Sequence, residues 1–375
     1  MNLKKITCKV TLFFGMLTTF SSCVGQNTSE SKSETPEVHE KADSLGDIAT
    51  ELDDRVMVIF QDKNDHYWFG GGENGVYKYD GKTLVLYSMK DGLCSNAVLG
   101  IQEDIMGRIY FDTSDGVCKF DGQKFETLPL KDENASMNEW KLEPNDLWFR
   151  MGWNSNGPYR FDGNFLYQLA FPKIEQADKF YAQFPNASFN PYGIYSLYKD
   201  RQGSVWFGTS SLGVCRYDGT SISWLYEEQM TTTSDGGALG IRSVLEDKDG
   251  YFWFTNTRYR YDISPGNSER NGTSYINYKK KNGIGYTDEN GEIDFPYFMS
   301  IAEDNDGDLW MVTYSDGVWR NDGEVLTHYP IKDGEKDILL FSIYKDKQGI
   351  LWLGSHNTGA LRFNGKTFEK FEILQ

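Results

Sequence analysis

The sequence predicts an all-β fold, a β-propeller of seven four-stranded antiparallel blades. Two observations support this fold. One sequence pattern, an apolar strand, a turn, an aromatic strand and a second turn, recurs seven times after Arg55. Six of the copies place an Asp six residues before an aromatic residue. Self-similarity at a spacing of about 40 residues is typical of repeat architectures. The pairs are Asp62 and Trp68, Asp104 and Tyr110, Asp200 and Trp206, Asp247 and Trp253, Asp304 and Trp310, and Asp346 and Trp352. In the third copy Trp148 keeps its place, while Leu142 replaces the Asp.

The fourth copy shows each part of the repeat. Alternating or apolar runs predict four strands, A to D, at residues 194–198, 205–209, 214–217 and 221–226. Asp218-Gly219 is the two-residue signal of a hairpin turn between strands C and D. Four short antiparallel strands that repeat radially form a propeller blade. Because the array runs from Val56 to Phe371, we expect closure by packing of the first blade on the last, unless residues 46–54 add an edge strand.

The N-terminus predicts an export signal and a lipid anchor. Residues 1–22 combine Lys4, Lys5 and Lys9 with an apolar run at 10–20, which is too short to span a bilayer. Small residues then precede Cys23, as in a bacterial lipobox, so Cys23 is the expected lipidation site; plain secretion is the alternative. Residues 23–54 are polar and rich in Ser and Glu, which predicts a flexible tether before a propeller at 55–375.

The net charge of the chain excludes one class of binding partner. The net charge is −17, and loss of residues 1–22, with three Lys and no acid, makes it −20. Nucleic acid binding is excluded on this basis, because it requires a basic surface.

Three cysteines follow Cys23, so at least one is unpaired or pairs between molecules. We interpret Cys94, Cys118 and Cys215 as small buried apolar residues.

Two stretches resemble a known family. They are 246–254, Glu-Asp-Lys-Asp-Gly-Tyr-Phe-Trp-Phe, and 199–209, Lys-Asp-Arg-Gln-Gly-Ser-Val-Trp-Phe-Gly-Thr. Both resemble the two-component regulator propeller repeat, and the resemblance recurs across residues 55–375. In that family's best-known setting, paired arrays form the periplasmic sensor of hybrid histidine kinases that detect glycans. This chain shows one array and no kinase-length region, so the resemblance implies a propeller and a possible glycan ligand but no signalling activity.

Strand direction sorts the loops onto two faces. The A–B and C–D turns share a turn face, while the B–C and D–A loops share a loop face that carries the long insertions. Long loops in compact domains are commonly functional, so the loop face over the central channel is the predicted binding surface. The candidate ligand-binding residues are Arg150, Trp153, Arg242, Asn256, Tyr314 and His356. For Trp153 the alternative is a packing anchor, and for Arg150 an ion pair with a neighbouring acid.

Catalysis and metal binding have weaker support. The repeated Asp residues are explained by their turns, and a catalytic carboxylate would be singular. Only four His are present, without a His/Cys cluster at ligand spacing, so we expect no metal and no cofactor. The segment Asp304-Asn305-Asp306-Gly307-Asp308 lies in a repeat turn and lacks the distal Glu of a calcium loop. Acids in the variable loops leave the question of an enzyme open, although a non-catalytic protein is favoured.

The sequence therefore favours a cell-envelope binding or sensing lipoprotein, non-catalytic, with a glycan as one candidate ligand. The membrane is reached through the lipid anchor only, and outer-membrane sorting is expected because no Asp follows Cys23. The alternatives are a scaffold that binds an envelope protein partner in an outer-membrane assembly, and a lyase or glycosidase. The ligand, the side of the outer membrane, the partners and the oligomeric state do not follow from the sequence.

Overall fold

The computed structural model describes residues 45–131, 139–227, 230, 239–287 and 290–373. The predicted signal, Cys23 and most of the predicted tether lie outside these residues. Within them the fold is predominantly β, and its helical elements include α1 (Glu175–Gln183) and the 3₁₀ turn η1 (Met89–Asp91). No described helix has both the length and the apolar composition to cross a membrane.

The first three sequence copies each form their own antiparallel sheet. The first contains β2 (Val58–Gln61), β3 (Tyr67–Gly70), β4 (Val76–Tyr79) and β5 (Leu84–Tyr87), with β1 (Asp47–Ala49) added beyond β5. The second contains β6 (Val98–Glu103), β7 (Ile109–Thr113), β8 (Gly116–Phe120) and β9 (Phe125–Thr127). The third has three described strands, β10 (Leu147–Phe149), β11 (Tyr159–Phe161) and β12 (Leu166–Gln168).

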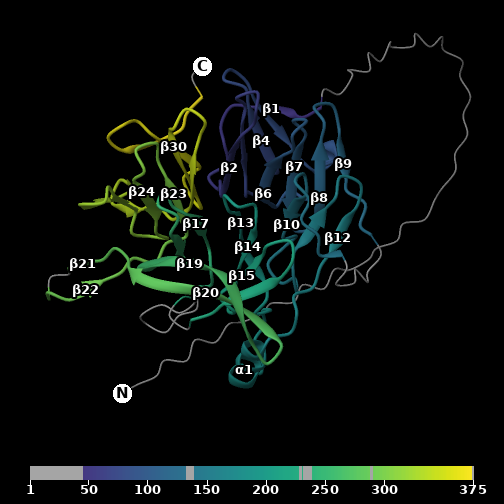
Figure 1. The fold of residues 1–375 in the computed structure, drawn as a ribbon. Helices are drawn as coiled ribbons and strands as arrows, with labels where there is room; N and C mark the ends of the chain where they lie inside the picture. Colours follow the sequence, from purple (N-terminus) through teal and green to yellow (C-terminus); the bar gives the residue numbers. More distant parts are fainter. Residues whose placement is uncertain (1–44, 132–138, 228–229, 231–238, 288–289, 374–375) are drawn as a thin grey trace, which may run out of the picture. The chain divides into compact units, whose positions relative to one another are not determined.

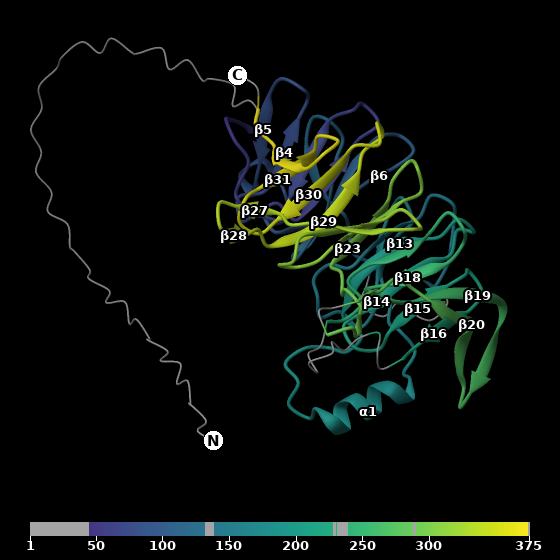
Figure 2. The same cartoon turned by 90° about the vertical axis from the view of Figure 1, so that its left-hand side faces the viewer.

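Copies four and five share one sheet of eight strands. Copy four supplies β13 (Ile194–Lys199), β14 (Val205–Thr209), β15 (Val214–Tyr217) and β16 (Ile222–Leu225). Copy five supplies β17 (Val244–Glu246), β18 (Phe252–Phe254) and the long hairpin of β19 (Asn256–Arg270) and β20 (Thr273–Asn282). The two sets join because β20 pairs in parallel with β16. In Figures 1 and 2 this hairpin reaches beyond the strands next to it.

The last two copies return to four-stranded antiparallel sheets. They are β23 (Ser300–Glu303), β24 (Leu309–Val312), β25 (Val318–Asn321) and β26 (Leu326–Tyr329), followed by β29 (Leu340–Lys345), β30 (Leu351–Ser355), β31 (Ala360–Phe363) and β32 (Phe368–Lys370). Two short hairpins lie in the preceding D–A connections, β21 (Tyr286–Thr287) with β22 (Ile293–Asp294), and β27 (Lys332–Asp333) with β28 (Lys336–Asp337). The all-β architecture that the repeat predicted is confirmed.

The repeated Asp organises each A–B turn. In copy four, one carboxylate oxygen of Asp200 accepts the backbone N–H groups of Gln202 and Ser204, at 3.0 and 2.8 Å. Its other oxygen accepts the indole Nε1–H of the buried Trp206, at 2.8 Å. The same carboxylate-to-indole bond occurs at Trp68, Trp253, Trp310 and Trp352. The Asp therefore pairs a buried polar group that would otherwise be left without a partner.

A second bond links consecutive copies across the turn face. The backbone N–H of the residue after one turn Asp donates to the side chain just before the next turn Asp. Examples are Lys63 to Glu103, Arg201 to Glu246 and Lys248 to Glu303. Between the last and first copies, Lys347 N–H donates to Gln61 Oε1 at 2.8 Å. The same kind of backbone-to-side-chain hydrogen bond thus joins the two ends of the array.

Further contacts close the array between copies seven and one. The Tyr67 hydroxyl donates to Asp346 at 2.7 Å, and Gln61 N–H donates to the Tyr344 hydroxyl at 3.0 Å. The buried Trp352 ring packs against Phe69 with ring centres 5.9 Å apart. The backbone also bridges the two ends, because the Val56 N–H donates to the Ser355 carbonyl of β30 at 2.9 Å. Among the described strands, none of the first copy belongs to the sheet of the seventh copy. Closure therefore depends on this bridge and the packed side chains.

Residues 45–54 belong to the folded unit. Of the two expectations for this segment, a tether and an edge strand from residues 46–54, the structure shows the edge strand. Asp47, Ile48 and Ala49 of β1 pair with β5 and add an edge strand to the first sheet. Gly46 N–H donates to Asp91 at 2.9 Å, and Asp53 accepts the Tyr77 hydroxyl at 2.8 Å. The segment is polar, but it is ordered by backbone pairing, which composition does not reveal.

Cys94 and Cys118 form a disulfide, with Cα atoms 5.8 Å apart. The interpretation of all three cysteines as apolar filling was therefore wrong for this pair, while Cys215 is buried and unpaired. Cys94 lies in the D–A loop before β6, a position that the repeat pattern does not assign to a strand, so its partner was not predicted. A disulfide suits an exported protein.

Replacing both Cys94 and Cys118 with Ser should lower the free energy of unfolding by about 3 kcal/mol, the value expected for a closed loop of this length. The two residues are separated by 24 positions in the sequence. Urea denaturation would measure the loss. A reducing agent should destabilise the wild type but leave the double variant unchanged; an equal shift in both would contradict the disulfide.

Candidate functional site

Equivalent positions in the copies form a ring around one end of the central channel. Each lies five residues before the turn Asp, near the start of strand A on the loop face. We call this ring the channel mouth; its described members are Met57, Leu99, Tyr195, Arg242, Met299 and Phe341. Five are apolar or aromatic, and Arg242 is the charged member. All six line one cavity of about 610 Å³ that continues along the inner strands.

The channel wall is different at the third copy. There the described sheet has three strands, and β10 faces the channel directly. Side chains make contacts that an inner strand would otherwise make: Gln102 donates from Nε2 to the Trp148 carbonyl at 2.7 Å. Arg150 donates to the Tyr195 carbonyl at 2.9 Å and also to the Leu99 carbonyl. Arg150 therefore joins strand β6 to strand β13.

A buried carboxylate accompanies Arg150. Asp112 is 2% exposed, and it accepts the backbone N–H groups of Arg150 and Met151 at 3.0 and 2.9 Å. Its Oδ2 lies 3.9 Å from Arg150 Nε. Burial raises the pKa of Asp112, and the positive charge of Arg150 opposes that rise. The Arg150 guanidinium thus makes structural contacts with two carbonyls and one acid. This arrangement corresponds to the alternative in which Arg150 pairs with a neighbouring acid.

Trp153 covers the same guanidinium. The Arg150 guanidinium carbon lies 4.2 Å from the centre of the Trp153 ring, within cation–π range. Trp153 also meets Tyr195 edge to face, with ring centres 5.6 Å apart. The ring is partly buried, so this Trp is a packing anchor over Arg150 that keeps some exposed surface beside the channel mouth.

Arg242 is held differently from Arg150. Its guanidinium lies over the Tyr195 ring at 4.1 Å, and Nε donates to the Leu239 carbonyl at 2.9 Å. Within the described part of the chain, its two terminal nitrogens have no hydrogen-bond partner, and no carboxylate lies within ion-pair distance. Burial lowers the pKa of Arg242. The residue remains charged at neutral pH, because a free guanidinium titrates far above it.

A second group gathers around His356. Its ring meets Phe341 and Tyr314 edge to face, with centres 5.3 and 5.6 Å apart, and Tyr314 is 46% exposed. Burial lowers the pKa of His356, and the positive charge of Arg55 lowers it further, so the ring is neutral at pH 7. We find no hydrogen bond to either ring nitrogen from the residues that the structure describes.

Asn256 does not join either group. It is 6% exposed, its Oδ1 accepts the Arg258 N–H at 3.0 Å, and its Nδ2 donates to the Phe254 carbonyl at 3.3 Å. Both ends of the amide therefore serve the start of β19. Sequence reasoning selected this residue from its loop position, and missed Tyr195 and Phe341, which line the channel mouth. The sequence signal that could have found them is their position, because each lies five residues before the turn Asp of its copy.

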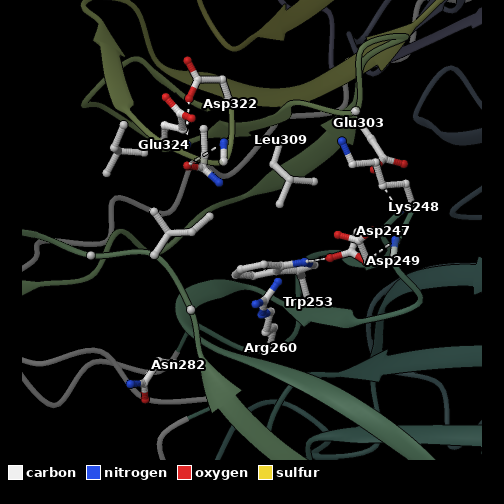
Figure 3. Close-up of a pocket in the computed structure, with 17 residues that line it drawn as sticks. Asp247, Lys248, Asp249, Trp253, Arg260, Asn282, Glu303, Leu309, Asp322 and Glu324 are labelled. Atoms are coloured by element: carbon white, nitrogen blue, oxygen red, sulfur yellow. Dashed lines mark hydrogen bonds between the residues drawn. The ribbon is translucent and has the colours of Figure 1, made fainter.

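A separate pocket of about 380 Å³ opens between copies five and six on the turn face (Figure 3). It lies beside the β19–β20 hairpin. Three of its acids make scaffold contacts: Asp247 accepts the Trp253 indole N–H, as drawn in Figure 3, and Glu303 accepts the Lys248 N–H at 2.8 Å. Asp322 accepts two backbone N–H groups of its own turn. We therefore assign these residues to the scaffold.

Metal-ligating residues do not gather anywhere in the described ranges: no three His, Cys, Asp or Glu side chains are grouped to hold an ion. Asp304 of the calcium-like segment accepts the N–H groups of Asp306 and Asp308 and the Trp310 indole N–H, as the other turn Asp residues do.

Comparison with known families matches the pattern described as "Two component regulator propeller" to residues 188–211 and 335–357. These stretches cover the A–B regions of copies four and seven. The chain carries two-component regulator propeller repeats. The resemblance noted in the sequence is thereby confirmed. No curated protein matches the chain.

Solved structures show the same fold as this chain. The extracellular domain of the one-component system BT4673 from B. thetaiotaomicron has a TM-score of 0.56 at 19% identity, covering 88% of this chain and 41% of that chain. Virginiamycin B lyase from Staphylococcus aureus has a TM-score of 0.55 at 14% identity, covering 84% and 96%. PorZ, a surface component of the type-IX secretion system of Porphyromonas gingivalis, has a TM-score of 0.53 at 15% identity, covering 83% and 46%. At these identities the likeness shows the fold alone.

Proposed function

We propose that this protein is a non-catalytic binding or sensing lipoprotein of the cell envelope, a seven-bladed propeller that receives its ligand at the channel mouth. One observation carries the proposal. A ring of apolar and aromatic side chains surrounds a 610 Å³ cavity, and a single guanidinium in that ring has no hydrogen-bond partner for its terminal nitrogens among the residues that the structure describes. Cavities lined by apolar groups with a few polar groups are typical ligand sites.

The chemistry of the mouth fits a glycan. Sugar rings have apolar faces that stack on aromatic side chains, and Phe341, His356 and Tyr314 offer such surfaces at one side of the mouth. The neutral His356 ring adds a donor and an acceptor for hydroxyl groups. The family's association with sensor proteins and the extracellular neighbours support the same class of ligand.

Three observations support a place in the envelope. The sequence begins with a signal-like segment that ends at Cys23, the folded unit contains a disulfide, and one similar structure is an extracellular domain. We propose that lipid at Cys23 anchors the mature chain, with the outer membrane as the expected site.

A second candidate function is a scaffold for an envelope protein. It is favoured by exposed aromatic side chains at the end of α1, in the long connection between copies three and four. Tyr181, Phe184 and Phe189 are 46%, 49% and 37% exposed, and Phe180 contacts all three rings. Figures 1 and 2 both show α1 standing apart from the sheets. Exposed apolar patches of this kind commonly mark interaction surfaces.

Calorimetric titration of the full chain against a panel of oligosaccharides tests the first candidate. We expect at least one oligosaccharide to bind, and Phe341→Ala and Tyr314→Ala each to weaken it by about tenfold or more. Lys82→Ala, in a turn on the opposite face, is the matched control and should bind as the wild type does. Absence of binding, or binding that the two mouth variants leave unchanged, would reject the proposal.

Two other results would favour the alternative functions. An envelope protein that binds the wild type but not Tyr181→Ser or Phe184→Ser would favour the scaffold. Turnover of an oligosaccharide, detected by release of product in the calorimeter cell, would favour a lyase or glycosidase and overturn the non-catalytic assignment.

A further inference from the structure

We propose that the ligand carries an anionic group, a carboxylate or a sulfate on a glycan, which binds the free end of the Arg242 guanidinium. This inference rests on the proposed function, because it assumes that the channel mouth is the binding site. It adds the chemical class of the ligand and the residue that selects it.

Arg242 is preorganised for such a contact. Tyr195 supports one face of its guanidinium, and the Leu239 carbonyl holds Nε. The side chain is therefore oriented, while its two terminal nitrogens remain without a partner among the described residues. A guanidinium presents its donors in a planar fork that matches the two oxygens of a carboxylate or sulfate. Little rotational freedom remains to be lost on binding, which favours affinity.

The local charge also favours an anion. Arg150 lies close enough to Arg242 for their positive charges to repel, and this repulsion adds to burial in lowering the pKa of Arg150. Asp112 is the described carboxylate that offsets the pair, and it lies beside Arg150. An anion at Arg242 would supply the missing negative charge. Because both cations are partly buried, their field is screened less than that of surface charges.

This positive site is unusual for the chain, whose net charge is −17. The other ring members at the mouth are uncharged, and His356, which contacts the ring member Phe341, is neutral at pH 7. A ligand that contacts both Arg242 and the Phe341 group therefore needs a negative group at one end and a largely uncharged body that contacts Phe341 and Tyr314. An acidic oligosaccharide, with uronate or sulfate groups, meets both requirements, whereas a small inorganic anion meets only one.

The test uses the full chain and three oligosaccharides of equal length: one neutral, one containing uronate and one sulfated, with inorganic sulfate as a fourth probe. We expect an acidic oligosaccharide to bind at least about tenfold more tightly than the neutral one. Arg242→Gln should abolish that preference, and Arg242→Lys should keep part of it. Arg201→Gln, which removes a half-exposed guanidinium on the turn face, is the matched control.

Each outcome decides one of the two proposals. If neutral and acidic oligosaccharides bind equally at the mouth, the proposed function stands and the anionic ligand is rejected. If Arg242→Gln keeps the preference while its melting temperature is unchanged, Arg242 is not the selecting residue and the inference fails. If no oligosaccharide binds, the proposed function itself falls. A preference that weakens with added salt and is lost in Arg242→Gln supports the inference.

Discussion

Deleting residues 332–375 should abolish cooperative unfolding of the protein. The deletion removes the sheet of the seventh copy, and with it the Trp352 ring that packs on Phe69 and the Lys347 bond to Gln61. Core side chains of the first and sixth copies would then face water, and none of their described strands pair with each other to hold the ends together. Thermal melting followed by circular dichroism should show a broad, non-cooperative change in place of a single transition.

Deleting residues 1–44 is the matched control, because it removes the same length of chain. The compact unit that contains the sheets runs from Ser44 to Gln375, so we expect the melting curve to stay as in the wild type. If the chain without residues 332–375 melted at the wild-type temperature and as sharply as this control, that result would contradict a closed array.

The repeat made most of the scaffold predictable. Six copies keep the same spacing between the turn Asp and its aromatic partner because one carboxylate must reach both the turn amides and the donor of the aromatic ring. That donor is an indole N–H in five copies, as at Trp206, and the Tyr110 hydroxyl in the second copy. A local constraint of this kind leaves a fixed interval in the sequence. The strands on either side then follow from alternation, and their order follows from short antiparallel connections.

Pairing between distant segments was not predictable in the same way. The parallel contact of β16 with β20, the edge strand β1 and the Cys94–Cys118 disulfide each depend on a partner from another copy or from outside the array. Their local sequences fit several partners equally well. Only the packed fold decides which one is adjacent, so periodicity carries no signal for them.

The candidate site was predicted in part. Arg150, Trp153 and Arg242 were selected from separate positions, and the structure brings them together around Tyr195. Tyr314 and His356 also come together at the same face. Asn256 was misplaced because a B–C loop residue can turn inward and satisfy its amide locally, which the residue type does not reveal. The differing roles of Arg150 and Arg242 required the contacts of each guanidinium.

Arg150→Met should lower the free energy of unfolding by about 3 kcal/mol or more, because it leaves the buried Asp112 carboxylate without its cation. It also frees the Leu99 and Tyr195 carbonyls, which the guanidinium joins across the third copy. Urea denaturation at pH 7 would measure the loss. Lys332→Met is the control: both members of its pair with Asp337 are about half exposed, so its removal should cost less than about 1 kcal/mol.

The loss in Arg150→Met should depend on pH in a defined direction. Burial already raises the pKa of Asp112, and Arg150 opposes that rise, so the variant should raise it further. The folded variant then holds this proton more tightly than the unfolded chain does. Its free energy of unfolding therefore falls as pH rises from the acid range to neutrality, and the gap to the wild type widens. Adding Asp112→Asn to Arg150→Met should remove the pH dependence. A gap that stayed constant between pH 4 and pH 7 would show that the cost comes from the two lost carbonyl contacts and not from the buried charge.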